Sequence, residues 1–177
     1  MFTQSSFLSL LFTSTTLFQL SIAKATFTDS TVAYLTNCQT SDTAAIYSEV
    51  SIYSDVTQSF DGQGPDAFED TSLGATTIWE GATVTWFYAR DDPNQADTLT
   101  ERINADAQDP SVPTFAQVGC AGYTLGGGDG SAIFLSFNCY KDDPRVLYTT
   151  SDHECSTVYY CRMTSDPCIV SSLGKCK

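Results

Sequence analysis

Thr83-Val-Thr-Trp-Phe-Tyr-Ala-Arg90, with Asp92-Pro93 just beyond it, is the segment from which we predict the fold class. Its β-branched and aromatic residues favour a strand, and the apolar pair Trp86-Phe87 indicates that this strand is buried. Asp92 is suited to accept hydrogen bonds from the first free N–H groups of a helix, and Pro93 suits the first helical position. We therefore expect a strand over 83–90 and a helix that begins at 93.

The helical pattern extends through residues 93–106. Ala96, Leu99 and Ile103 recur at i, i+3 and i+7 and form one apolar stripe. Glu101 falls off this stripe and is expected to face elsewhere. The spacing predicts a helix over 93–106 that packs with its apolar side against the rest of the domain.

Beyond Pro113 the composition is that of strands. Gly126-Gly-Gly-Asp-Gly130 lies between two β-favouring runs and predicts a hairpin turn. A phosphate-binding loop is the alternative, but such a loop precedes a helix and usually carries a Lys, and neither is found here. The predicted strands are 114–125, 131–140, 146–150 and 157–162. We thus predict an α+β fold: a mainly antiparallel β-sheet covered by one helix at about 93–106.

Two interpretations compete for residues 44–56. Ile46, Val50 and Tyr53 fall at helical spacing, whereas the Ser, Val, Ile and Tyr content suits a strand. We favour the helix. Residues 58–74, rich in Asp, Gly and Pro, are predicted to form a long acidic surface loop.

The N-terminal residues 1–25 are typical of a secretory signal peptide. They contain apolar runs and end in the small-residue triplet Ala23-Lys24-Ala25, although no Lys or Arg precedes the apolar part. We predict cleavage after Ala25, which leaves residues 26–177 as a single secreted, disulfide-rich domain. No later run is apolar and long enough to cross a bilayer, so we expect no membrane association.

The chain has seven cysteines, all beyond the predicted cleavage site. In an exported protein they predict disulfides, whose pairing the spacing leaves open. A zinc site is the alternative, but the short Cys-x2-4-Cys spacing that zinc sites favour is absent. The odd number predicts one free thiol, or a link to a second copy or to a secreted partner. The residues are Cys38, Cys120, Cys139, Cys155, Cys161, Cys168 and Cys176.

The formal net charge of −13 argues against two classes of partner. Nucleic acids and anionic membranes both need clustered Lys and Arg. Calcium is a further alternative, because Asp, Asn and Glu oxygens in one loop suit this ion. Several acids fall between 55 and 70, but without the register of an EF-hand.

Catalytic motifs are missing from the sequence. His153 is the only histidine, so a nuclease with two histidines is excluded and a serine or cysteine triad has one candidate base. A glycosidase needs only two carboxylates that face each other. Glu49 and Glu80 are the first candidates, because both lie near β-favouring, aromatic segments. We assign no catalytic, cofactor-binding or metal-binding residue.

The chain as a whole resembles the small secreted cysteine-rich effector and avirulence proteins of plant-colonising fungi. The resemblance rests on layout: a leader ending Ala23-Lys24-Ala25, scattered cysteines, and a Ser/Thr/Asp-rich composition without a catalytic motif. It implies a non-enzymatic protein without a cofactor that binds a host protein or a cell-wall polymer, outside or inside host cells, and promotes colonisation. The alternatives are a secreted carbohydrate-active enzyme or sugar-binding module, and an antimicrobial or killer-toxin-like protein.

Overall fold

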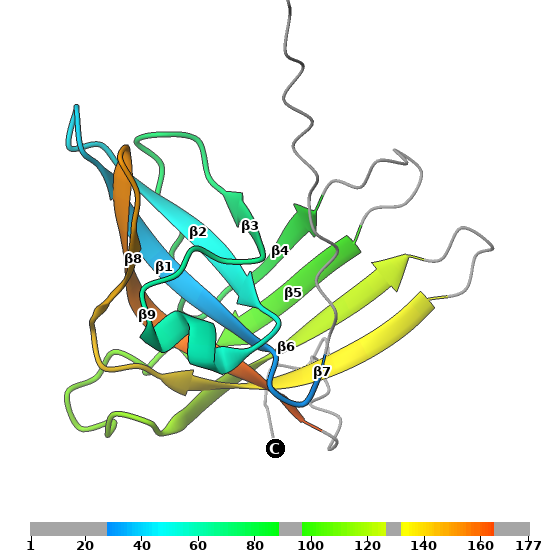
Figure 1. The fold of residues 1–177 in the computed structure, drawn as a ribbon. Coiled ribbons are helices and arrows are strands. Elements are labelled where there is room, and N and C mark those ends of the chain that lie inside the picture. Colours follow the sequence, from blue (N-terminus) through cyan, green and yellow to red (C-terminus); the bar gives the residue numbers. More distant parts are fainter. Residues whose placement is uncertain (1–27, 89–96, 127–131, 165–177) are drawn as a thin grey trace, which may run out of the picture.

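The computed structural model describes residues 28–88, 97–126 and 132–164, and within them almost all regular structure is β (Figure 1). Nine strands form one sheet. One short 3-10 helix, η1 (Val56–Phe60), begins where the Asp55 side chain accepts a hydrogen bond from the backbone N–H of Thr57. The strands are β1 (Val32–Thr40), β2 (Ile46–Tyr53), β3 (Ala67–Asp70), β4 (Thr83–Tyr88), β5 (Asp97–Ile103), β6 (Gln117–Gly126), β7 (Ala132–Lys141), β8 (Val146–Thr149) and β9 (His153–Thr164).

The sheet curls into a nearly closed barrel. Its strand order is β3-β2-β1-β9-β7-β6-β5-β4, and every neighbouring pair is antiparallel. The β1–β9 pairing joins the start of the described chain to its end, and the two outermost strands, β3 and β4, contact each other. β8 lies off this path and pairs only with β9. An up-and-down sheet closed in this way has an inner and an outer face along every strand.

The predicted covering helix at 93–106 is wrong, and with it the α+β class. Residues 97–103 form strand β5, whose buried positions are Asp97, Leu99, Glu101 and Ile103 in strict alternation. Leu99 and Ile103 are four residues apart, a spacing that places two residues on the same face in both a helix and a strand. Glu101 lies between them and is also buried, but because it is charged the sequence does not show the apolar alternation of a strand. Residues 93–96 lie outside the described residues.

The helix favoured for 44–56 is also wrong, because residues 46–53 form strand β2. Seven of its eight residues are buried, so the alternation that marks a half-exposed strand is missing. The loop predicted for 58–74 contains the end of η1 and strand β3. Phe87, predicted to be buried beside Trp86, is exposed on the outer face of β4.

The other predicted strands are confirmed where the structure describes them. β4 covers most of 83–90, and β6 and β7 pair as consecutive antiparallel strands, as the predicted hairpin requires. Its glycine-rich turn, at 127–131, lies outside the described residues. β8 and β9 correspond to the predictions at 146–150 and 157–162, with β9 longer at both ends.

Two apolar clusters lie on opposite faces of the sheet. The inner cluster fills the barrel and includes Leu35, Val50, Leu99, Ile103 and Phe137. The outer cluster lies on β1, β2 and β9 and packs against β8 and η1; its members are Val32, Tyr34, Cys38, Tyr47, Tyr53, Leu147, Tyr148 and Cys155. This second layer explains why β2 is buried on both faces.

Each cluster contains a disulfide that joins directly paired residues of adjacent strands. Cys38–Cys155 links β1 to β9 in the outer cluster, and Cys139–Cys161 links β7 to β9 in the inner cluster. Cys120 is also disulfide-bonded, whereas Cys168 and Cys176 lie outside the described residues. Disulfide formation is confirmed, and it is compatible with an oxidising, extracellular destination. No helix in the described part of the chain has the length and apolar character needed to cross a membrane.

Candidate functional site

Glu101 is buried inside the barrel. Alternation along β5 places its side chain on the same face as Leu99 and Ile103, and its cross-strand partners are Val84 on β4 and Ala121 on β6. Its exposed fraction is 1%, and neither carboxylate oxygen has a hydrogen-bond partner in the described structure. A buried carboxyl group with no partner among the described residues is unusual, because buried polar groups are normally hydrogen-bonded.

Two indole rings lie in the same part of the interior. Trp86 of β4 pairs with Leu99 of β5, and its ring stacks on that of Trp79, with centroids 5.7 Å apart and planes inclined by 26°. Both rings are buried, and neither Nε1–H finds an acceptor among the described residues. Buried Trp N–H groups usually have a partner, so this pair is also unusual.

Glu80 reaches this site through a turn just before β4. Gly81 has φ +79°, its N–H donates to the Ile103 carbonyl at 2.9 Å, and Glu80 forms an isolated bridge with Ile103. The positive φ favours glycine at this position. Glu80 accepts a hydrogen bond from the Tyr159 hydroxyl, which in turn accepts one from Gln108 Nε2 at 2.8 Å. Glu80 is therefore held in place by a short polar chain.

Burial, together with the nearby Glu80 carboxylate, raises the pKa of Glu101 to about 8. The indole N–H of Trp86 acts in the opposite direction and lowers the pKa, but it does not complete a hydrogen bond with Glu101. At neutral pH Glu101 is thus mainly a neutral carboxylic acid, able to donate as well as accept. We refer to Trp79, Glu80, Trp86 and Glu101 as the indole–carboxyl cluster.

The segment after β5 packs against the inner core near this cluster. Ala107 is fully buried in the inner core, and the Asn104 N–H donates to the Val118 carbonyl at 2.7 Å. Lys141 Nζ donates to the carbonyl oxygens of Asp109 and Val112 and ties this segment to β7. These contacts hold the segment after β5 against the inner core, β6 and β7.

Glu49 belongs to the outer cluster, and its environment differs from that of Glu101. The Tyr148 hydroxyl lies 2.7 and 2.9 Å from its two carboxylate oxygens, and the Ser51 hydroxyl donates to one of them. Burial raises the pKa of Glu49, whereas these two hydroxyls and the nearby His153 lower it. Glu49 is therefore a buried carboxyl group whose oxygens both accept hydrogen bonds.

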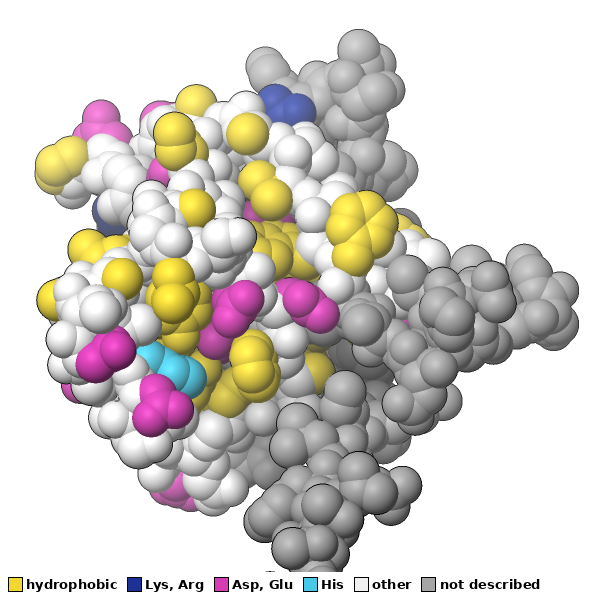
Figure 2. Space-filling view, turned by 90° about the horizontal axis from the view of Figure 1, so that it is seen from above, with side chains coloured by type: hydrophobic (Ala, Val, Ile, Leu, Met, Phe, Trp, Pro, Cys, Tyr) yellow, Lys and Arg dark blue, Asp and Glu magenta, His cyan; other side chains and the backbone are white. Residues whose placement is uncertain are grey.

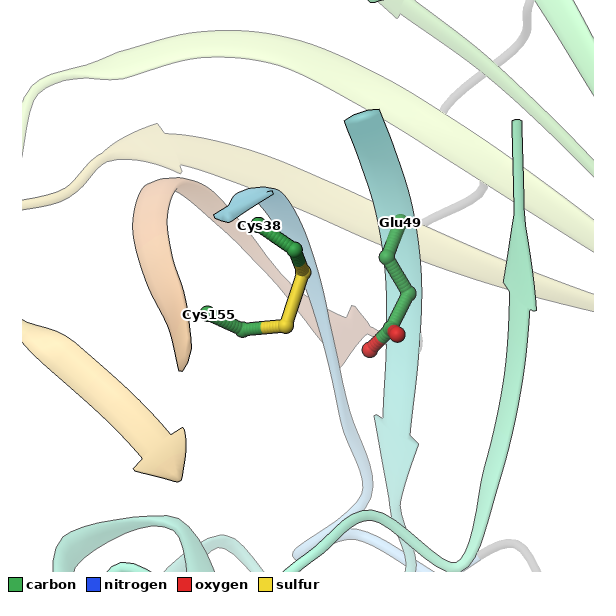
Figure 3. A group of neighbouring side chains, drawn as sticks. All are labelled: Cys38, Glu49 and Cys155. Atoms are coloured by element: carbon green, nitrogen blue, oxygen red, sulfur yellow. A yellow bond between two sulfur atoms is a disulfide. The ribbon is translucent and has the colours of Figure 1, made fainter. Parts of the chain in front are cut away.

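Glu49 also lies beside the Cys38–Cys155 disulfide (Figure 3). Potential ligand atoms of these three residues lie within 4.8 Å of one another, and no other group of three or more such residues is found in the described part of the chain. Metal binding by cysteine requires thiolates, and these two sulfur atoms are bonded to each other. In the oxidised protein the group is a structural element.

The structure separates the two carboxylates that the sequence suggested as a glycosidase pair. Glu49 shares a face with Thr36, its partner on β1, whereas Glu80 contacts Tyr159, whose partner Leu35 is on the opposite face. His153 lies 3.3 Å from the Tyr148 hydroxyl and is part of the Glu49 network.

The acids of the predicted loop serve local structure. Asp55 caps η1, and Asp66 accepts hydrogen bonds from the backbone N–H and hydroxyl of Ser54. The structure does not bring them together as calcium ligands within the described residues. The face of the molecule seen from above carries several Asp and Glu side chains with hydrophobic side chains between them (Figure 2).

Comparison of the chain with protein-family models, with curated proteins and with solved structures gave no match. The geometry of the indole–carboxyl cluster is therefore the basis on which we infer a function. The sequence analysis named Glu80 but placed Glu101 on the outside. The signal that could have found it is the alternation of Leu99, Glu101 and Ile103 with β-branched Thr98 and Thr100.

Proposed function

We propose that this chain is an extracellular binding protein that holds a small organic molecule inside its barrel, at the indole–carboxyl cluster. One observation carries the proposal. Six buried side-chain polar atoms lack a hydrogen-bond partner in the described structure, and four of them belong to Trp79, Trp86 and Glu101. The remaining two atoms, Gln58 Oε1 and Asp142 Oδ2, belong to residues outside this cluster.

The energetic cost makes this concentration informative. Each buried polar group without a partner costs about 1–3 kcal/mol, so folded proteins rarely leave several at one place. The same barrel satisfies other buried acids: Tyr123 donates to Asp97 at 3.1 Å, and Tyr148 donates to Glu49. A ligand with donors and acceptors at the cluster would remove the cost.

The architecture suits this role. Eight strands follow one another along the sheet path, with β8 outside it. Barrels of about eight strands are just wide enough to be filled by side chains or to hold one small ligand. Disulfides in both clusters make such a barrel resistant to unfolding outside the cell.

Tryptophan fluorescence gives a direct test, because Trp79 and Trp86 are the only tryptophans in the chain. We expect fractions of a small-molecule extract from colonised plant tissue to change the emission of the native protein and to raise its melting temperature. The signal should be lost in Glu101→Gln and kept in Glu49→Gln, a matched change of a buried glutamate on the opposite face. If no fraction changes the emission, or if both variants behave alike, the proposal is wrong.

The biological role that we propose starts from the sequence. We propose that residues 1–25 direct secretion and that the protein acts as a non-enzymatic effector, by taking up a small molecule at the surface of a colonised host. The proposal rests on the leader, the disulfides and the resemblance to secreted effectors. A producing strain that lacks the protein should colonise less well, and the Glu101→Gln form should not restore colonisation. Full restoration by that form would contradict the role.

A glycoside hydrolase is the second candidate, because Glu101 and Glu80 lie close enough for one charge to affect the other. A raised pKa suits a general acid, and a neighbouring carboxylate suits a nucleophile or base when the two groups are about 5–10 Å apart. Turnover of aryl glycosides that Glu101→Gln abolishes would establish this activity. Binding without turnover would exclude it.

A further inference from the structure

Charged side chains are distributed unequally over the two faces of the barrel wall. Glu101 and Asp97 lie on the inner face of β5, where Tyr123 donates to Asp97, and Glu80 accepts a hydrogen bond from the inward-facing Tyr159. Glu69 of β3 pairs with Val50, a member of the inner core, and so takes a register position on the same face. Four acidic positions thus belong to the inner face of the described barrel.

The basic residues of the described chain lie elsewhere. Arg145 donates to the Ser59 carbonyl and the Tyr34 hydroxyl in the outer layer. Lys141 is engaged by carbonyl oxygens of the segment after β5. Arg102 and Arg162 alternate with the inward-facing Glu101 and Cys161, and so point to the outer face.

We propose that the ligand is an organic ammonium compound: an amine on an apolar body that also carries a hydrogen-bond acceptor such as a hydroxyl group. This inference rests on the proposed binding function and names the class of its ligand. An ammonium group offers hydrogen-bond donors and charge to Glu101 and Glu80. The acceptor is required by the two indole N–H groups, which can only donate.

The surrounding side chains favour an apolar body between these polar ends. Leu99, Ile103 and Ala121 flank Glu101 on its own strand and across the β5–β6 pair, and all three are fully buried. An apolar group placed against them would be removed from water. A free inorganic cation would leave these contacts unused.

Two other ligand classes fit the cluster less well. An anion would meet carboxyl groups without a described basic residue to pair with. A metal ion would find too few ligands, because indole nitrogens carry hydrogen and Glu80 already accepts a hydrogen bond from Tyr159. Consistently, Glu80 and Glu101 do not belong to a group of three potential metal ligands.

Three probes of similar size test the inference on the native, oxidised protein. Tyramine carries an amine and a hydroxyl, phenethylamine carries the amine alone, and tyrosol replaces the amine of tyramine with an uncharged alcohol. Binding is measured by calorimetry, and by emission excited where only tryptophan absorbs. We expect tyramine to bind most tightly, phenethylamine more weakly, and tyrosol weakest, by about tenfold or more relative to tyramine because the charge-assisted contact is lost.

Variants then connect the preference to the cluster. Glu101→Gln should weaken tyramine binding by about tenfold or more and change tyrosol binding much less, because only a bound cation favours the ionised form of Glu101 over the neutral one. Glu49→Gln should leave all three affinities unchanged, and near-ultraviolet circular dichroism checks that each variant is folded. Equal affinities of tyrosol and tyramine, or no binding of any probe, would overturn the ammonium inference. The binding function itself is decided separately by whether any extract fraction changes the tryptophan emission of the native protein, a readout that does not depend on ligand charge.

Discussion

Glu49 and Glu101 are both buried glutamates of one β-sheet, but they lie on opposite faces, and only Glu49 is hydrogen-bonded. Glu49 accepts hydrogen bonds from Tyr148 and Ser51 within the outer cluster. Glu101 faces the barrel interior beside two indole rings, and neither of its oxygens has a partner among the described residues. The first arrangement stabilises the fold, whereas the second leaves buried polar atoms unsatisfied, and the two sites should therefore respond differently to substitution.

Removal of the Tyr148 hydroxyl should destabilise the protein. Tyr148→Phe would leave Glu49 buried without the hydroxyl that lies near both of its oxygens. The expected loss in the free energy of unfolding is about 1–3 kcal/mol, the cost of a buried polar group that loses its partner. Urea denaturation measures it. Unchanged stability would show that Glu49 is not held by Tyr148.

The stability of the native protein should fall as the pH rises from 4.5 toward 8. Burial and the neighbouring Glu80 raise the pKa of Glu101 from 4.5 to about 8, so the folded state keeps a proton that the unfolded state releases. Between these values the unfolded state binds fewer protons, which gives a loss of up to about 1.4 kcal/mol per pH unit.

Glu101→Gln isolates this contribution, because glutamine does not titrate. The variant should show a flatter dependence of unfolding free energy on pH than the native protein, measured in urea at intervals from pH 5 to pH 8. Other acids with raised pKa values, Glu49 and Asp142 among them, are common to both proteins and cancel in the comparison. Parallel curves would mean that Glu101 is ionised in the folded state.

Much of the sheet could be predicted from the sequence, but β2 and β5 could not, and in both the reason is burial. β2 is covered on one face by the barrel interior and on the other by the outer cluster, so Ile46, Val50 and Tyr53 carry no alternation that indicates a strand. In β5 the buried positions include the acids Asp97 and Glu101. If charged residues are assumed to be exposed, only Leu99 and Ile103 of these four are assigned to the core, and their spacing is that of a helix.

The candidate site was also missed, and here the reason is strand register. Sequence spacing gave no means to choose the facing carboxylates. Glu49 and Glu80 were the first candidates because both lie near β-favouring, aromatic segments, but they lie on opposite faces of the sheet. The partner of Glu80 is Glu101, brought beside it by the turn at Gly81 and the bridge to Ile103. Such contacts depend on strand register, which composition does not encode.

The two described disulfides should differ in their contributions to stability. Cys38 and Cys155 are 117 residues apart in sequence, whereas Cys139 and Cys161 are 22 apart. A longer closed loop restricts the unfolded chain more, which predicts about 5 kcal/mol for the first bond and about 3 kcal/mol for the second. The paired changes Cys38→Ala/Cys155→Ala and Cys139→Ala/Cys161→Ala remove the same atoms from a buried site. Calorimetric melting should show the larger loss for the first pair, and the reverse order would contradict the loop argument.

Gly119 should be intolerant of any side chain, because a Cβ atom on this residue of β6 would clash with β5. A Cβ atom placed there would lie 2.4 Å from the Arg102 carbonyl oxygen and 2.8 Å from Ile103 Cδ1. The first neighbour is backbone and cannot move without disturbing the pairing of Gly119 with Ile103, two residues from Glu101. Gly119→Ala should therefore cost about 1–3 kcal/mol through overpacking.

Gly64→Ala is the matched control, because a Cβ atom at Gly64 meets nothing within 4 Å. Its effect should stay within about 0.5 kcal/mol, since surface changes without contacts rarely exceed this. The β5–β6 register also positions Glu101, so Gly119→Ala should weaken ligand binding in the folded protein, whereas Gly64→Ala should not. Equal stability and equal binding of the two variants would show that the close approach of β5 and β6 does not position the site.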